Sequence, residues 1–143
     1  EQTITIAISA FNLLHELGVS GGIELIVDAE NYQNLIGINW LQPISAFVAE
    51  INSTTNYFEQ YLRALLDLPM GETNTNQKSA VTGRLKTDPT SDDYRPYLHL
   101  MARNPRLKFD QRMKLVGIAG GNLEELLTEI IHAQQYYSGE IDS

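Results

Sequence analysis

A short acidic cluster follows the apolar run of residues 23–27 and offers oxygen ligands close together in the chain. Asp28, Glu30 and Asn31 come directly after the sequence Ile-Glu-Leu-Ile-Val. Carboxylate and amide oxygens are the ligands that hard divalent cations such as Mg²⁺ prefer. If residues 23–27 form a strand, Asp28 lies at its end and is placed to help hold such an ion. Periodicity does not decide between strand and helix for so short a run.

The stretch ELIVDAENYQNL, residues 24–35, resembles the opening of NYN domains, the PIN-like ribonuclease family in which a strand ends in Asp and a nearby Asn begins a helix. The resemblance implies a Mg²⁺-dependent ribonuclease in which Asp28 binds the metal and Asn31 orients it. The family carries further acids in a Ser-Gly-Asp-x-Asp-like turn. The nearest counterpart here, GIAGGNLEEL, has Gly121 and Leu123 at those positions. A nuclease centred on Asp28 is therefore the alternative function.

Other residue patterns that support catalysis are missing from the sequence. Glu129 and His132 have the Glu-x-x-His spacing of di-iron helical bundles, but such a site needs a second copy and two more glutamates. The chain has no cysteine, which excludes thiolate metal sites and cysteine nucleophiles. It also lacks a Gly-x-Ser-x-Gly elbow and a P-loop. We predict no cofactor, and no metal except at Asp28 in the alternative function.

Positive charge gathers in residues 103–114 of an otherwise acidic chain, whose net charge is −8. Complementary charge steers protein association, and tyrosine is common at interfaces. The few, scattered cations elsewhere disfavour nucleic acid and anionic membranes as partners. We predict binding to another protein or to a second copy of the chain. The predicted partner-binding residues are Arg103, Arg106, Lys108, Arg112, Lys114, Tyr136 and Tyr137.

The first half of the chain is predicted to supply three helices. In residues 3–17 apolar side chains recur on one helical stripe and Gly18 follows at the C-terminal end, which favours helix over a strand at 3–9. The segment after Asn31 shows no second strand. A helix starts near Pro43, and Asn56 with Glu59 has the spacing that begins the next one, which Pro69 stops.

The second half is predicted to be a polar loop followed by three helices. Residues 70–93 are rich in Thr, Asn, Asp and Gly, which indicates a mobile loop with one short helix near 77–86. Ser91 or Asp92 caps a helix that ends before Pro105, and Asp110 caps another that ends at Gly120. The last helix runs from Asn122 to Gly139. Its predicted inward-facing residues are Leu123, Leu126, Leu127, Ile130 and Ile131.

Taken together, these patterns predict a mainly α fold. The length of 143 residues suits one domain, so we expect a single domain over residues 1–143. It would be a bundle of five to seven short helices, with a minor strand element near 3–9 and 23–27. No apolar run approaches the roughly 18 residues that span a bilayer, and localisation is left open. The predicted function is non-enzymatic: protein–protein interaction, or a structural subunit of an assembly.

Overall fold

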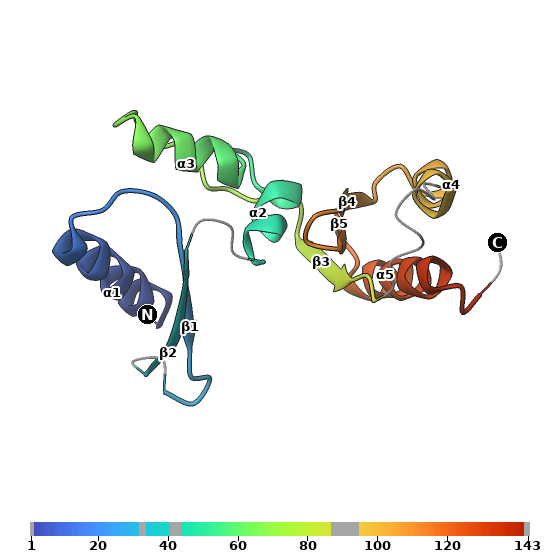
Figure 1. Ribbon diagram of the computed structural model, residues 1–143, viewed down its shortest axis with the longest axis horizontal. Helices are drawn as coiled ribbons and strands as arrows, with labels where there is room; N and C mark the ends of the chain where they lie inside the picture. Colours follow the sequence, from blue (N-terminus) through green and yellow to red (C-terminus); the bar gives the residue numbers. More distant parts are fainter. Residues whose placement is uncertain (1, 32–33, 41–43, 87–94, 142–143) are drawn as a thin grey trace. The chain divides into compact units, whose positions relative to one another are not determined.

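The computed structural model describes residues 2–31, 34–40, 44–86 and 95–141. The chain divides into two compact units (Figure 1). The N-terminal unit comprises Glu1–Ala46 and Tyr57–Gly71, and the C-terminal unit comprises Phe47–Asn56 and Glu72–Ser143. The prediction of one domain over residues 1–143 stays a prediction. Within the described ranges, no helix is both long and apolar enough to cross a lipid bilayer.

The N-terminal unit begins with helix α1, Gln2–Leu17. Gly18 ends it in the left-handed conformation, with φ of +64°, and its amide donates to the carbonyl of His15 over 3.1 Å. Glycine suits this position because it has no Cβ to clash. The predicted helix over residues 3–17 is confirmed, and the alternative strand at residues 3–9 is wrong.

Strands β1, Ile23–Val27, and β2, Leu35–Trp40, form an antiparallel hairpin in which Leu25 lies opposite Ile38. The residues between them close a turn around Asp28. The amide of Asp28 donates to the carbonyl of Asn34 over 3.0 Å, and its carboxylate accepts from the amide of Glu30 over 2.8 Å. We predicted no second strand after Asn31, and this prediction is wrong because β2 lies there. The apolar run of β1 is rich in β-branched residues, which favour strands, and it pairs with the apolar run of β2.

Helix α3, Tyr57–Leu65, completes the N-terminal unit and begins directly after Asn56, as predicted. Its tyrosines pack against the glycines that precede β1. A Cβ on Gly21 would lie 3.0 Å from the ring of Tyr61, and one on Gly22 would overlap the ring of Tyr57. Glycine suits both positions, because a Cβ would have to displace these rings and Gly21 also has a positive φ of +141°.

The C-terminal unit contains a three-stranded antiparallel sheet that the sequence did not predict. Its strands are β3, Ser79–Arg84, β4, Lys108–Asp110, and β5, Leu115–Gly120, in the order β3-β5-β4. The predicted helices near 77–86 and 110–120 are wrong, and β3 lies inside the predicted polar loop 70–93. Central strand β5 is buried along nearly its whole length. Its apolar run therefore lacks the alternation that marks a half-exposed strand.

Asp110 shows why this part of the chain was mispredicted. Its carboxylate accepts from the amide of Met113 over 2.9 Å, which is the bond expected of a helix N-cap. Here the same bond stabilises the tight turn between β4 and β5, and Lys114 completes that turn with φ of +55°. A helix start and a turn share this local geometry, so residue types alone do not separate them.

Three helices surround this sheet: α2, Ala46–Asn52; α4, Arg95–Arg103; and α5, Leu123–Ser138. A Cβ on Gly83 of β3 would lie 2.7 Å from Ile130 of α5, and one on Gly117 of β5 would lie 2.9 Å from Phe47 of α2. Successive residues of a strand alternate between its faces. Gly117 and its neighbours Val116 and Ile118 therefore face opposite sides, so that α2 and α5 cover different faces of the sheet.

A single apolar cluster forms the core of the C-terminal unit. Its buried members are Leu85, Leu100, Leu107, Val116, Ile118, Leu126, Ile130, Ala133 and Tyr137. Helix α5 has the predicted caps: the side chain of Asn122 accepts the amides of Glu124 and Glu125, and Gly139 has φ of +72°. Only some of the residues that were predicted to face inward from α5 are buried.

Leu126 and Ile130 of α5 are buried, whereas Leu123, Leu127 and Ile131 are about half exposed. The buried stripe of the helix is thus narrower than the sequence predicted, because it rests on a sheet that α5 meets along one line. The predicted mainly α bundle is wrong as a whole. The described residues form a mixed α/β structure with a two-stranded and a three-stranded sheet.

Candidate functional site

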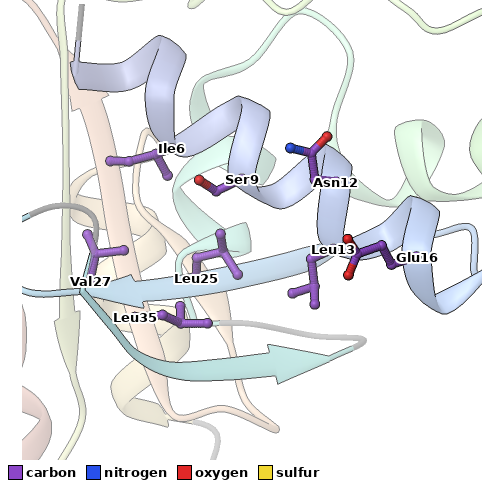
Figure 2. Close-up of a pocket in the computed structure, with 8 residues that line it drawn as sticks. All are labelled: Ile6, Ser9, Asn12, Leu13, Glu16, Leu25, Val27 and Leu35. Carbon is purple, nitrogen blue, oxygen red and sulfur yellow. The ribbon is translucent and has the colours of Figure 1, made fainter.

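A cleft of about 340 Å³ lies between α1 and the hairpin of the N-terminal unit. Figure 2 shows this cleft lined by side chains of α1 on one side and by three aliphatic side chains of the strands on the other. Its apolar lining consists of Ile6, Leu13, Leu25, Val27 and Leu35. This volume lies at the lower end of the range for small-molecule sites. The cleft is therefore large enough to receive a small apolar group.

The polar side chains of this cleft all come from α1: Ser9, Asn12 and Glu16. The hydroxyl of Ser9 donates to the carbonyl of Thr5 over 3.1 Å, so that it serves its own helix. Activation of a serine as a nucleophile needs a general base that accepts its proton, and the bond described for this hydroxyl is to a main-chain carbonyl instead. The shape and lining of the cleft thus suit the binding of an apolar group.

Glu24 occupies the other face of the hairpin, because neighbouring strand residues alternate and Leu25 faces the cleft. The carboxylate accepts from the side-chain amide of Asn39 over 2.6 Å and from the main-chain amide of Ser45 over 3.3 Å. Hydrogen bonds from Ser45, and then from Asn39, hold the pKa of Glu24 below its usual value, against a smaller opposing effect of burial. Glu24 is thus an ionised, fixed carboxylate.

A second polar cluster joins α4 to α5 in the C-terminal unit, and we call it the imidazole cluster: His99, Arg103, His132 and Tyr136. Nη1 of Arg103 lies 2.7 Å from Nε2 of His132. The ring of Tyr136 stacks on His99 at a centroid distance of 4.6 Å and on His132 at 6.5 Å. The cluster presents a guanidinium and two imidazoles, which suits an anionic or a planar ligand.

The structure separates the two tyrosines that the sequence grouped together. Tyr136 is half-buried in the imidazole cluster. Tyr137 is buried in the core, and its hydroxyl lies 3.0 Å from that of Tyr97. Adjacent residues on a helix point in different directions, so that only one of them can join the core fully. Tyr137 is therefore placed as a core residue and not as a surface contact.

The predicted cations do not form one patch. Arg103 belongs to the imidazole cluster, whereas Arg106 forms an exposed ion pair with Glu125 over 2.7 Å. Lys108 lies on β4, and Arg112 and Lys114 lie in and after the turn that follows it. All five are exposed. Their role in binding a protein partner stays a prediction.

Neither the Asp28 alternative nor the Glu-x-x-His spacing, from which no metal site was predicted, is assembled as a ligand group in the described residues. Asp28 stabilises the hairpin turn, Glu129 accepts a hydrogen bond from the side-chain amide of Asn104 over 3.0 Å, and His132 contacts Arg103. Across the described ranges, no three side chains of His, Cys, Asp or Glu come together as a metal site.

Sequence reasoning missed two features of these sites. Glu24 interrupts an otherwise apolar strand, and this interruption was a usable signal for a functional or paired carboxylate. The contact between Arg103 and His132 gave no such signal. The two residues are 29 positions apart and meet only because α4 packs on α5.

Three solved structures resemble this chain in fold. An ADP complex of N5-carboxyaminoimidazole ribonucleotide synthetase matches with a TM-score of 0.70 and 21% identity, over 99% of this chain and 40% of that chain. The same enzyme from Thermotoga maritima matches with a TM-score of 0.66 and 20% identity, over 89% of this chain and 39% of the other.

The phosphoribosylaminoimidazole carboxylase ATPase subunit from Aquifex aeolicus also matches with a TM-score of 0.66, at 14% identity, over 88% of this chain and 41% of the other. The chain thus spans about two fifths of the length of these structures. No protein-family model and no curated protein matches it.

These likenesses overturn both functions predicted from the sequence. The chain is similar in fold to part of these solved structures, which supports neither a non-enzymatic structural subunit nor a PIN-like nuclease centred on Asp28. The dozen residues that suggested the nuclease form an antiparallel hairpin and its turn. The chain is similar in fold to about two fifths of a solved N5-carboxyaminoimidazole ribonucleotide synthetase.

Proposed function

We propose that this chain acts as part of an ATP-dependent enzyme that carboxylates an aminoimidazole ribonucleotide. One observation carries the proposal: the fold matches enzymes so named over 88–99% of the chain, with TM-scores of 0.66–0.70. The match includes strands and helices of both units, since it extends over nearly the whole chain.

The imidazole cluster supports this proposal because a ribonucleotide carries a phosphate. Phosphate recognition in proteins favours arginine, whose planar guanidinium donates several hydrogen bonds at once. Arg103 is suited to this role because the contact found for it in the structure is to an imidazole and not to a carboxylate. Its positive charge is therefore not neutralised by that contact. We assign Arg103 as the residue that binds the ribonucleotide phosphate.

Arg106 provides the contrast within the same segment. Its guanidinium is paired with the carboxylate of Glu125 over 2.7 Å. A phosphate would have to compete with that carboxylate, which costs affinity. The proposal therefore distinguishes between two arginines that are three residues apart.

The test is a binding measurement, because the chain spans only two fifths of the enzymes it resembles. Isothermal titration calorimetry of the full chain with phosphoribosylaminoimidazole should show saturable binding. Arg103→Gln should weaken it by about 10- to 100-fold, the range for loss of hydrogen bonds to a charged group. Arg106→Gln, the matched control, should change it by less than about threefold.

Two results would count against the proposal. Absence of binding to phosphoribosylaminoimidazole and to ADP, each tested separately, would overturn it. Equal losses in the Arg103→Gln and Arg106→Gln variants would show a diffuse electrostatic effect and would remove the assignment of Arg103.

A further inference from the structure

We propose that His132 is a positioning residue for Arg103: its neutral imidazole holds the guanidinium in the orientation that receives the ribonucleotide phosphate. The inference rests on the proposed function and adds to it a second residue and a dependence on pH. It starts from the distance of 2.7 Å between Nη1 of Arg103 and Nε2 of His132.

The chemistry of the two side chains fixes the direction of this bond. Arginine donates hydrogen bonds and cannot accept them, so that Nε2 of His132 must be the acceptor. An imidazole that accepts at Nε2 carries its proton on Nδ1 and is neutral. The bond orients the guanidinium without cancelling its charge. The other N–H groups of the guanidinium then point along directions that this bond has set, because the group is planar and rigid.

Two other arginines of the described residues contact carboxylates instead of an imidazole. Arg63 is paired with Glu59 over 2.6 Å and Arg106 with Glu125 over 2.7 Å. Both pairs neutralise the arginine. Glu129 is the acid one turn before His132 on α5. Its carboxylate accepts from the side-chain amide of Asn104.

Stacking keeps the imidazole in place. Tyr136 lies one turn after His132, and their rings are parallel to within 8°. The other stacking partner of Tyr136 is His99 of α4, with an interplanar angle of 22°. Helix α5 and helix α4 therefore both restrict the rings on which the position of Arg103 depends. A hydrogen bond from one side chain orients a second side chain only if the first is itself held still.

Acid should undo the arrangement. Among the described residues, His132 contacts Arg103 of α4 and stacks on Tyr136 of α5, and His99 of α4 stacks on the same tyrosine ring. Glu129 lies one turn before His132 on α5. Histidine is the side chain that changes charge between about pH 5 and 8. A proton on Nε2 removes the acceptor and places a second cation beside the guanidinium. Arg103 then loses its orientation, so that affinity for the phosphate should fall as the pH falls.

The experiment compares His132→Gln and His132→Leu in the full chain, with phosphoribosylaminoimidazole as the probe. Calorimetric affinities are measured at about pH 8 and about pH 5.5, on either side of the histidine range. Glutamine keeps an acceptor oxygen that does not titrate, whereas leucine has no acceptor. At pH 8, His132→Leu should bind about tenfold more weakly than the wild type, as expected for the loss of one hydrogen bond to a charged group. His132→Gln should keep most of the wild-type affinity.

The pH profile separates positioning from a structural role. The phosphate itself titrates near pH 6, so the quantity of interest is the ratio of wild-type affinity to that of His132→Gln at each pH. This ratio should fall by about tenfold where acid protonates the imidazole, because only the wild type can lose its acceptor in this way. A ratio that stays constant would overturn the inference.

Two further outcomes distinguish this inference from the proposed function. Binding that is lost in Arg103→Gln but unchanged in His132→Leu would overturn the positioning role and leave the proposed function standing. Wild-type protein that does not bind the ribonucleotide would overturn the proposed function, and the positioning role with it. Nitrogen NMR gives a check without ligand: at about pH 8, a His132 ring protonated on Nε2 would contradict the bond from which the inference starts.

Discussion

The two units of this chain differ in how well they bury their apolar side chains. The C-terminal unit has a continuous core in which Val116 and Ile118 are fully buried. In the N-terminal unit, none of the described residues is buried to that degree. Its helix α1 instead exposes Ile4, Ile8 and Phe11, with 64%, 54% and 67% of their surfaces accessible.

The difference shows where the stability of the chain resides. Burial of apolar area is the dominant favourable term in folding, so that the C-terminal unit should hold most of the stabilisation. The imidazole cluster belongs to this unit: Leu100 of α4 and Ile130 of α5 are both buried in the core beside it. Arg103 and His132 are therefore carried by well-anchored helices. Glu24 and the cleft belong to the less buried unit.

The largest expected difference between the units is in amide hydrogen exchange. Exchange proceeds through local openings whose free energies range from near zero to that of global unfolding. Amides of β5 and α5 should therefore exchange at least about a hundredfold more slowly than amides of α1 and β1. Exchange followed by mass spectrometry or NMR measures this directly. Equal protection in the two units would show that exposed area does not decide their stability.

Two adjacent leucines of α5 test the core of the C-terminal unit. Leu126 is 1% exposed and Leu127 is 43% exposed. Leu126→Ala should cost about 2–5 kcal/mol of unfolding free energy, because it leaves a cavity. Leu127→Ala should cost less than about 1 kcal/mol, because its site is already open to water. Urea unfolding followed by far-UV circular dichroism compares the two variants.

The N-terminal unit has its own probe, which serves as a control for this pair. Trp40 of β2 is the single tryptophan of the sequence. Its fluorescence should report the N-terminal unit in both leucine variants. Similar costs for Leu126→Ala and Leu127→Ala would contradict the packing of α5 on the sheet.

The smallest expected effect concerns Glu24 and pH. Since the folded-state pKa of Glu24 is lowered, its ionised form stabilises the hairpin above the unfolded-state pKa. This contribution is lost as the pH falls through the lowered folded-state value. The group is partly exposed, so that the loss should be below about 1 kcal/mol. Urea unfolding followed by Trp40 fluorescence, at neutral and acid pH, should show it.

Glu24→Gln supplies the control for this measurement. Glutamine does not titrate, so the acid-induced loss seen in the wild type should be smaller in the variant. An identical acid response in the two proteins would assign the effect to other carboxylates, and would remove Glu24 from the interactions that fix the hairpin.

The sequence by itself determined those features that depend on neighbours along the chain. Helix α1 and its end at Gly18, the start of α3 after Asn56, and both caps of α5 were predicted correctly. Each rests on residues within a few positions, such as the Asn122 side chain that accepts two amides of the first turn. The predicted starts at Pro43 and at Ser91 or Asp92 lie outside the described residues.

Only the tertiary structure decided the sheets and the candidate site. Strand β5 pairs with β3, which is about 35 residues earlier in the chain, and its backbone hydrogen bonds leave no local pattern. Asp110 makes the same bond in a turn that it would make at a helix start. Arg103 was singled out for its charge, but its partner was not foreseeable, because helix packing and not sequence spacing brings His132 to it.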